Sequence, residues 1–151
     1  MKLTPNFSLD EFVHTNHRNI NNSLPDELFN EAVKTCQMLE RIREYLSTLA
    51  GKDIPINISS GYRSPKLNRA VGGSKNSDHT RAQAADWTAR KFGTPYQVCK
   101  ALEPKIDELG IGQIIHEYGR WIHTSAVKPA RPVNRIITIS SSGTAVGIHY
   151  V

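Results

Sequence analysis

Residues 113–124 read QIIHEYGRWIHT and contain two strand-like runs separated by the turn residues 118–120, one of which is glycine. Two such runs joined in this way are typical of a β-hairpin. With this turn Glu117 faces Trp121, and the odd-numbered residues of both strands share one face of the sheet. The stretch therefore predicts an antiparallel pair in which Glu117 and His123 are diagonal neighbours, roughly 7–8 Å apart at the backbone.

Further strand patterns lie on both sides of this hairpin. Residues 54–58 alternate isoleucine with proline or asparagine, which is typical of a half-buried strand. Residues 83–88 have the composition of a buried, extended segment. Near the C-terminus, residues 135–140 and 145–150 flank Ser-Ser-Gly-Thr and predict a second hairpin.

Helices are predicted between these strands. The longest begins with Ser23 as its cap, carries apolar residues at spacings of three and four, and ends at Gly51. A second begins at Thr94-Pro95 and ends at Gly110, and residues 65–70 form a short one. With no internal repeat or linker, residues 1–151 are expected to form one domain of the α+β class, an antiparallel-rich sheet with helices packed against it.

The composition is that of an ordinary globular protein, with 38% hydrophobic and 22% charged residues. No apolar run reaches the roughly 18 residues that span a membrane, and we expect no secretory signal at the N-terminus. The formal net charge of +5 favours a polyanionic partner: nucleic acid, a membrane surface or a bacterial wall polymer. Since Lys and Arg are scattered without a basic tract, specific nucleic-acid binding is not expected. Cys36 and Cys99 are interpreted as buried, reduced thiols, with a disulfide between them as the alternative.

The unusual chemistry lies in residues 59–87, SSGYRSPKLNRAVGGSKNSDHTRAQAADW. His79 and Asp86 are seven positions apart, and Asp86 sits within an otherwise apolar run. A buried carboxylate needs a strong partner, because leaving it unpaired is expensive. A metal ion would be such a partner.

Together with the hairpin, the chain offers His79, Asp86 and His123 as metal ligands and Glu117 as a general base. Three nitrogen and oxygen ligands with an open fourth position describe a catalytic zinc site, whereas magnesium or calcium would require more oxygens. The alternative is that all four are ordinary loop, cap and hairpin residues. Trp121 lies on the same face by the hairpin count and can line a substrate groove, although core packing is its default role.

Residues 77–86, SDHTRAQAAD, resemble the S-x-H-x-x-G-x-A-x-D motif of the zinc D-alanyl-D-alanine carboxypeptidase family, which includes phage endolysins. SGYRSPKLN at 60–68, Glu117 followed by WIH, and LTPNFSLDEF at 3–12 are similar to its compact phage and prophage murein peptidases. The likeness covers most of residues 3–125. It implies the fold shared by these peptidases and the hedgehog domain.

The resemblance also implies roles for individual residues. His79, Asp86 and His123 would bind zinc, and Glu117 would activate the water. Arg63 would hold a substrate carboxylate or polarise the scissile carbonyl, a task that suits its planar donor fork.

Ser77 would add a hydrogen bond at the site, and the alternatives for Arg63 and Ser77 are a surface arginine and a loop hydroxyl. Two departures from the family pattern stand out. Ala82 replaces the motif glycine, which matters only if the position requires a positive φ. Many relatives carry the base three residues before the last histidine, where this chain has Arg120, whereas Glu117 is six before it.

The resemblance implies a zinc peptidase of the D,D-carboxypeptidase or L-alanyl-D-glutamate endopeptidase type that acts on bacterial peptidoglycan. We expect a monomer made in the host bacterial cytoplasm without a signal peptide, which reaches the cell wall after release or as a virion component. The rival hypothesis is a wall-binding module that retains the zinc but has lost catalysis.

Overall fold

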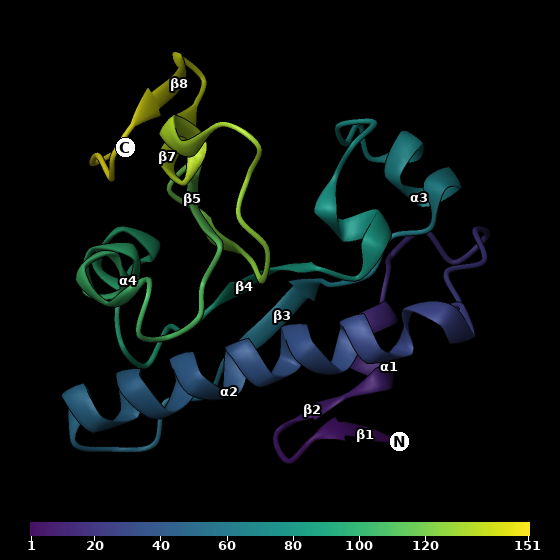
Figure 1. The fold of residues 1–151 in the computed structure, drawn as a ribbon, viewed down its shortest axis with the longest axis horizontal. Helices are drawn as coiled ribbons and strands as arrows, with labels where there is room; N and C mark the ends of the chain where they lie inside the picture. The colour runs from purple at the N-terminus through teal and green to yellow at the C-terminus, as the bar shows by residue number, and fades with distance from the viewer.

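The computed structural model describes all residues from Met1 to Val151, and Figure 1 shows the longest helix, α2 (Phe29–Ala50), running along the molecule next to β3. The apolar stripe of α2 belongs to the hydrophobic core. Gly51 ends the helix in the left-handed conformation, with φ of 67°, as the sequence predicts. Its predicted start at Ser23 is wrong. Pro25 is extended, and a 3₁₀ helix, η1 (Asp26–Leu28), precedes the first α-helical turn.

One sheet of six strands organises the chain, in the order β3-β4-β6-β5-β7-β8. All neighbours are antiparallel except β5 and β7, which are parallel. The α+β class with a largely antiparallel sheet is therefore confirmed. The strands are β3 (Asn57–Ser60), β4 (Ala84–Thr88), β5 (Gln113–Glu117), β6 (Trp121–Ser125), β7 (Ile136–Ser140) and β8 (Gly143–Val146).

The β5–β6 hairpin has the predicted register, with Glu117 opposite Trp121. Two other strand predictions need correction. The strand expected at 54–58 begins only at Asn57, because Pro55 has no N–H to contribute to the ladder. The strand expected at 145–150 is instead β8, which starts two residues earlier, at Gly143. It ends at Val146, and the chain leaves the sheet at Gly147, where φ is 89°.

The N-terminal segment forms a small two-stranded sheet, β1 (Lys2–Thr4) and β2 (Phe7–Ser8), followed by α1 (Leu9–Val13). Phe7 and Phe12 are fully buried in the core. The chain at Gly61 passes so close to the Phe12 carbonyl that a Cβ atom would collide with it. This glycine therefore allows the segment that leads to Arg63 to lie against α1.

The remaining helices are short and lie in the connections between the strands: α3 (Pro65–Ala70), η2 (Asp78–Arg81), α4 (Pro95–Leu102), η3 (Glu103–Lys105) and η4 (Pro132–Asn134). The helix predicted from Thr94 to Gly110 is thus shorter than expected. Pro104 cannot donate a hydrogen bond to the preceding turn, and the chain continues as the 3₁₀ helix η3. Cys36 and Cys99 are buried free thiols, as predicted.

The two faces of the sheet have different roles. Ala85, Trp87, Ile114 and Ile122 belong to the hydrophobic core that α2 and α4 share. Their neighbours along each strand point to the opposite face, because side chains alternate. That face carries the polar residues of the candidate site. No helix in the structure has the length and apolar character needed to cross a membrane.

Candidate metal centre

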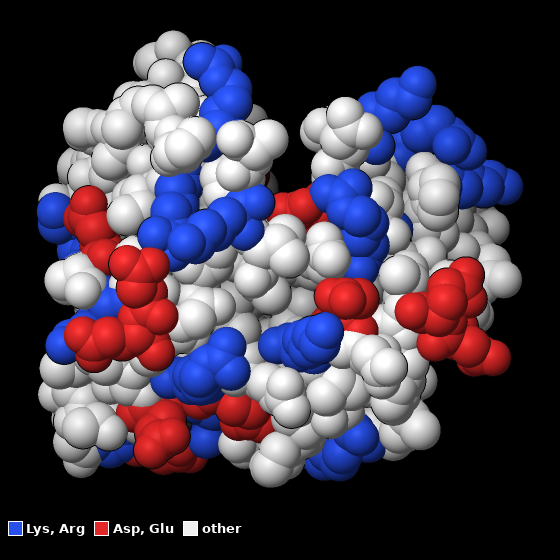
Figure 2. All heavy atoms as spheres, in the orientation of Figure 1, with Lys and Arg blue, Asp and Glu red and all other residues white.

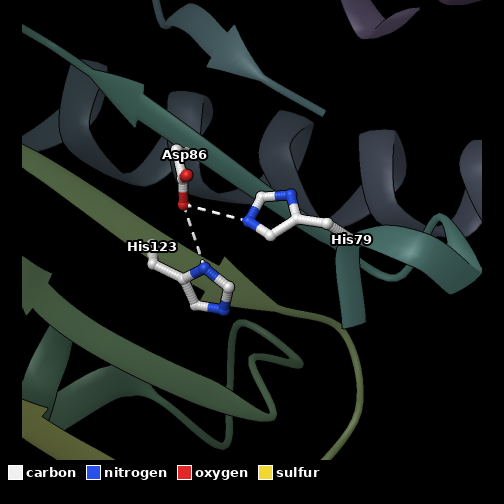
Figure 3. A group of neighbouring side chains, drawn as sticks. All are labelled: His79, Asp86 and His123. Carbon is white, nitrogen blue, oxygen red and sulfur yellow. Dashed lines mark hydrogen bonds and ion pairs between the residues drawn. The ribbon is translucent and has the colours of Figure 1, made fainter. Parts of the chain in front are cut away.

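His79, Asp86 and His123 meet at one point on the polar face of the sheet (Figure 3). Oδ1 of Asp86 lies 3.2 Å from Nε2 of His79 and 2.9 Å from Nδ1 of His123. One ligand atom from each residue lies within 4.8 Å of the others, and all three side chains are buried. These residues, which the sequence placed far apart, form a compact cluster that could hold a metal ion.

Strand pairing brings two of the three together. Asp86 on β4 is the register partner of His123 on β6. His79 comes from η2, where the Ser77 hydroxyl accepts a hydrogen bond from the His79 backbone N–H at 3.2 Å. Ala82 then reverses the chain into β4 with φ of 58°. The position at which this chain departs from the motif glycine therefore does require a positive φ.

Both histidine rings are anchored on the side away from the carboxylate. Nδ1–H of His79 donates to the Gly61 carbonyl oxygen at 2.7 Å. Nε2–H of His123 donates to the Ser125 hydroxyl at 2.9 Å, and that hydroxyl donates to the Gln113 amide oxygen at 3.5 Å. In a neutral ring each nitrogen that faces the cluster therefore carries a lone pair.

Three lone-pair atoms consequently face one another, on Asp86, His79 and His123. They repel one another unless a cation or a proton lies between them. Two imidazoles and one carboxylate, each oriented by an outer hydrogen bond, form a donor set that zinc favours, and the fourth position is left for water or substrate. The residues present therefore fit a zinc ion.

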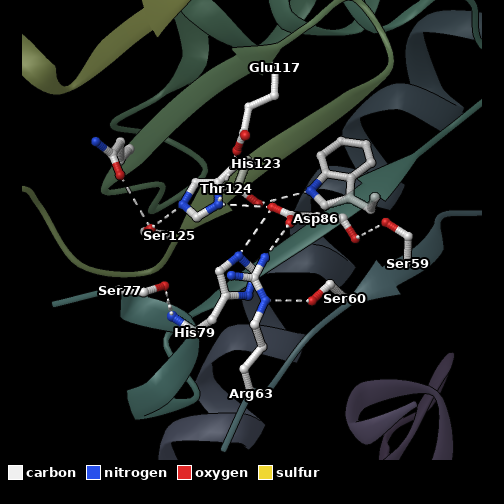
Figure 4. A network of polar contacts seen from close by, with 12 residues as sticks. Ser59, Ser60, Arg63, Ser77, His79, Asp86, Glu117, His123, Thr124 and Ser125 are labelled. Atoms are coloured by element: carbon white, nitrogen blue, oxygen red, sulfur yellow. Dashed lines mark hydrogen bonds and ion pairs between the residues drawn. The ribbon is translucent and has the colours of Figure 1, made fainter. Parts of the chain in front are cut away.

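The second carboxylate oxygen of Asp86 is held by Arg63, whose Nη2 donates to Oδ2 at 3.1 Å (Figure 4). Nε of Arg63 donates to the Ser60 hydroxyl at 3.0 Å, and Nη1 donates to the Asn68 amide oxygen at 3.1 Å. The side chain of Arg63 is only 15% exposed. These bonds use three of the five guanidinium N–H donors, so two remain for a ligand.

The electrostatics of the cluster favour positive charge. Burial alone would raise the pKa of Asp86, but when the two imidazoles are protonated the charge of His79 and hydrogen bonds from the His123 and His79 rings hold that pKa well below its ordinary value. For His123, burial acts to lower the pKa, whereas the hydrogen bond and charge of Asp86 outweigh it and raise the pKa. The cluster therefore stabilises a bound cation.

Glu117 lies at the edge of the cluster, with Oε1 3.8 Å from Nδ1 of His123. The hairpin thus brings it next to a candidate ligand despite its unusual spacing in the sequence. Burial raises the pKa of Glu117 and the charge of Asp86 adds to this effect, while the charges of His123 and Arg63 lower it by less. A carboxylate with a raised pKa is suited to accepting a proton near neutral pH.

Trp121 is half-buried directly opposite Glu117 in the hairpin register, and its indole N–H is buried without a hydrogen-bond acceptor. Ser77 lies beside His79. The structure therefore gathers all the residues selected from the sequence. Substrate contacts by Arg63, Ser77 and Trp121 stay predictions.

Sequence reasoning missed the residues that support the ligands: Ser60, Asn68 and Ser125. Ser125 could have been found, because it stands two residues after His123 in the same strand and so shares its face. Ser60 and Asn68 carry no such signal, since they become neighbours of Arg63 only through the path of the loop between β3 and α3.

A groove of about 680 Å³ leads to His123. It lies between the loop and 3₁₀ helix at 74–83 and the segment after β6, and is lined mainly by polar side chains. Lys128, Arg81 and Asp78 are among them, and Arg81 forms an ion pair with Asp78. Figure 2 shows Lys and Arg side chains on both sides of a hollow in the face that it draws, with acidic side chains between them.

The family model described as peptidase M15 matches residues 5–125, a range that contains the three clustered residues, Glu117 and Arg63, whereas Lys128 of the groove lies beyond it. No curated protein matches the chain.

Proposed function

The chain belongs to the peptidase M15 family, and from this premise we propose that it is a zinc-dependent peptidase that hydrolyses an amide bond in the peptide stem of bacterial peptidoglycan. The observation that carries the proposal is the convergence of two histidine lone pairs on Asp86, within reach of the Glu117 carboxylate. We further propose that the protein serves a phage or prophage in lysis or entry.

In this proposal His79, Asp86 and His123 hold the zinc ion. When bound, zinc would supply a water that is nucleophilic near neutral pH and would polarise the scissile carbonyl. Glu117 accepts the proton of the attacking water at its carboxylate and delivers it to the nitrogen of the leaving amine. Its partial burial keeps that carboxylate basic enough for the first transfer.

Arg63 has two tasks in the proposed reaction. Its bond to Oδ2 of Asp86 fixes the carboxylate so that Oδ1 faces the histidines. Its two free N–H donors offset the negative charge that develops on the carbonyl oxygen, or bind a substrate carboxylate. Ser77 holds the backbone of His79, and Trp121 lies opposite Glu117 in the hairpin, where its side chain would contact the substrate.

The groove supports a peptide substrate that bears carboxylates. It is polar, it reaches His123, and Lys128 on its wall forms no ion pair. The net charge of +5 adds long-range attraction to an anionic wall. Both features suit the acidic peptide stem of peptidoglycan.

Digestion of purified peptidoglycan by the zinc-loaded protein tests the proposal. Mass spectrometry of the released fragments identifies the cleaved bond from its new termini, and so separates a D,D-carboxypeptidase from an L-alanyl-D-glutamate endopeptidase. A chelator should abolish hydrolysis and added zinc should restore it.

The critical variant is Glu117→Gln, which keeps the shape but cannot accept a proton. We expect it to bind zinc and to lose at least about 100-fold in kcat. Glu108→Gln, at an exposed site, is the matched control. Absence of zinc binding, or full activity of Glu117→Gln, would refute the proposal. Wall binding without release of new amino groups would favour the wall-binding module.

A further inference from the structure

The turn of the β5–β6 hairpin contains an aromatic residue in a backbone conformation that seldom accepts one. Tyr118 has φ of 56° and is followed by Gly119 with φ of 68°, and the turn is closed by the Arg120 N–H donating to the Glu117 carbonyl at 3.0 Å. Asn and Gly are the residues that suit such a position. A bulky residue held there is a reason to look for a function.

Burial in the core does not explain why a tyrosine occupies position 118, because 46% of its surface remains exposed. Its ring instead packs against Trp121, with ring centroids 5.7 Å apart and planes inclined by 52°. The two rings line a pocket of about 330 Å³ together with Arg120, Ser141 and Val151. We call this pocket the aromatic notch.

The aromatic notch adjoins the candidate active site. Trp121 is the register partner of Glu117, the proposed base. A substrate whose amide bond reaches Glu117 therefore has another part of its structure close to the notch. Arg120 forms no ion pair, so its guanidinium is available to a ligand along with the Ser141 hydroxyl.

We propose that the aromatic notch binds an amino-sugar ring of the peptidoglycan glycan strand. This inference rests on the proposed function, because it takes peptidoglycan as the substrate. The stem peptide consists of alanine, acidic and diamino acids, none of which presents a ring face that could pack on an aromatic side chain. A sugar ring does, and its hydroxyl and acetamido groups match the donors of Arg120 and Ser141.

Binding there would make the enzyme prefer stem peptides that are still attached to the glycan. The test compares two substrates with the same stem peptide, one free and one linked to its amino-sugar disaccharide. Tyr118→Asn removes the ring and retains a residue suited to the left-handed turn. We expect it to reduce the preference for the linked substrate, measured as the ratio of the two kcat/KM values, by about tenfold.

Tyr118→Phe should keep the preference, and Val146→Asn, which removes an exposed apolar side chain outside the notch, is the matched control. Equal kcat/KM for both substrates in the wild type, or an unchanged ratio in Tyr118→Asn, would overturn the inference while leaving the proposed function intact. Failure to cleave either substrate would instead count against the proposed function.

A binding measurement tests the aromatic notch independently of peptidase activity. Trp121 fluorescence should change when a soluble N-acetylglucosamine oligomer is added to the wild type, and the affinity should fall about tenfold in Tyr118→Asn. The buried Trp87 should not respond. Absence of binding by the wild type, or equal binding by Tyr118→Asn, would overturn the inference.

Discussion

The Ser125 hydroxyl lies 2.9 Å from Nε2 of His123, on the side of the ring opposite the nitrogen that faces Asp86. Gln113 fixes the direction of this bond. Its amide nitrogen donates to the Asn134 carbonyl at 2.8 Å, so its oxygen faces Ser125 and accepts the hydroxyl proton. A hydroxyl that donates to Gln113 accepts from Nε2–H, and this arrangement leaves Nδ1 unprotonated as a metal ligand.

Ser125→Ala should therefore weaken zinc binding without unfolding the protein. Loss of an outer hydrogen bond to a ligating histidine typically costs 10- to 100-fold in metal affinity. Competition with a chromophoric chelator measures the affinity, and the spectrum of the cobalt-substituted protein shows whether the ligand geometry changes. Ser142→Ala, at an exposed site, is the control. Equal zinc affinity in Ser125→Ala and the control would contradict the assignment.

Arg63 should contribute to stability as well as to the site. It is the one partner of the buried Asp86 carboxylate whose charge does not depend on pH. Removing one member of a buried ion pair costs about 3–5 kcal/mol, so we expect Arg63→Ala to lower the free energy of unfolding of the metal-free protein by that order. Bound zinc should reduce the loss, because it supplies a replacement charge.

Urea unfolding with and without zinc measures both effects. Arg63→Lys is expected to recover only part of the loss, since an ammonium group cannot bind Asp86, Ser60 and Asn68 in the fixed geometry of a guanidinium. Arg69→Ala is the matched control, because Arg69 is an exposed arginine on α3 without an ion pair. A loss no larger than that of Arg69→Ala would show that Asp86 does not depend on Arg63.

The hairpin shows why part of this site was predictable. Side chains in a strand alternate between two faces, so the turn at Tyr118 alone determines that Glu117 and His123 lie on the same face. The place of Asp86 within an apolar run similarly predicted that its buried carboxylate would have a strong partner. Local periodicity thus accounted for the sheet class and the hairpin register, whereas the family resemblance selected His79, Asp86 and His123 as one set.

Other features depend on contacts that no local pattern contains. Ser60 at the end of β3 and Asn68 on α3 engage Arg63 only because the short connection between the two elements turns its side chain toward both. Pro55 and Pro104 shortened a predicted strand and a predicted helix, since the missing N–H of proline outweighed the apolar periodicity around it. The positive φ of Ala82 likewise follows from the path between η2 and β4.

His116 should make the stability of the protein depend on pH. It is 1% exposed on the core side of β5, where Nδ1–H donates to the His149 carbonyl at 3.0 Å and Nε2 has no partner. Burial lowers the pKa of His116, so the folded protein keeps it neutral while the unfolded chain takes up a proton below about pH 6.5. Stability is thus unaffected above that pH and is lost as the pH falls.

The His116→Asn variant isolates this effect, because asparagine retains an N–H donor but does not ionise. The free energy of unfolding of the metal-free protein, measured with urea at pH 7.5 and pH 5.5, should fall by more in the wild type than in the variant. The comparison cancels the opposite contribution of His123, whose raised pKa favours folding at lower pH. An equal fall in both proteins would show that His116 is protonated in the folded state.

Replacing Ala82 by the glycine of the family motif should leave the stability of the protein nearly unchanged. Relief of the left-handed conformation favours Ala82→Gly by about 1–2 kcal/mol. The buried methyl group is lost at about 0.8 kcal/mol, and the greater freedom of glycine in the unfolded chain costs about 0.5–1 kcal/mol. The free energy of unfolding should therefore change by less than about 1 kcal/mol.

The Ala82→Val variant should have a free energy of unfolding lower by about 3 kcal/mol or more. A β-branched side chain fits neither the φ of 58° nor the packed site. Urea unfolding of the wild type and the two variants measures these differences. A valine variant as stable as the wild type would mean that residue 82 is not in the left-handed conformation.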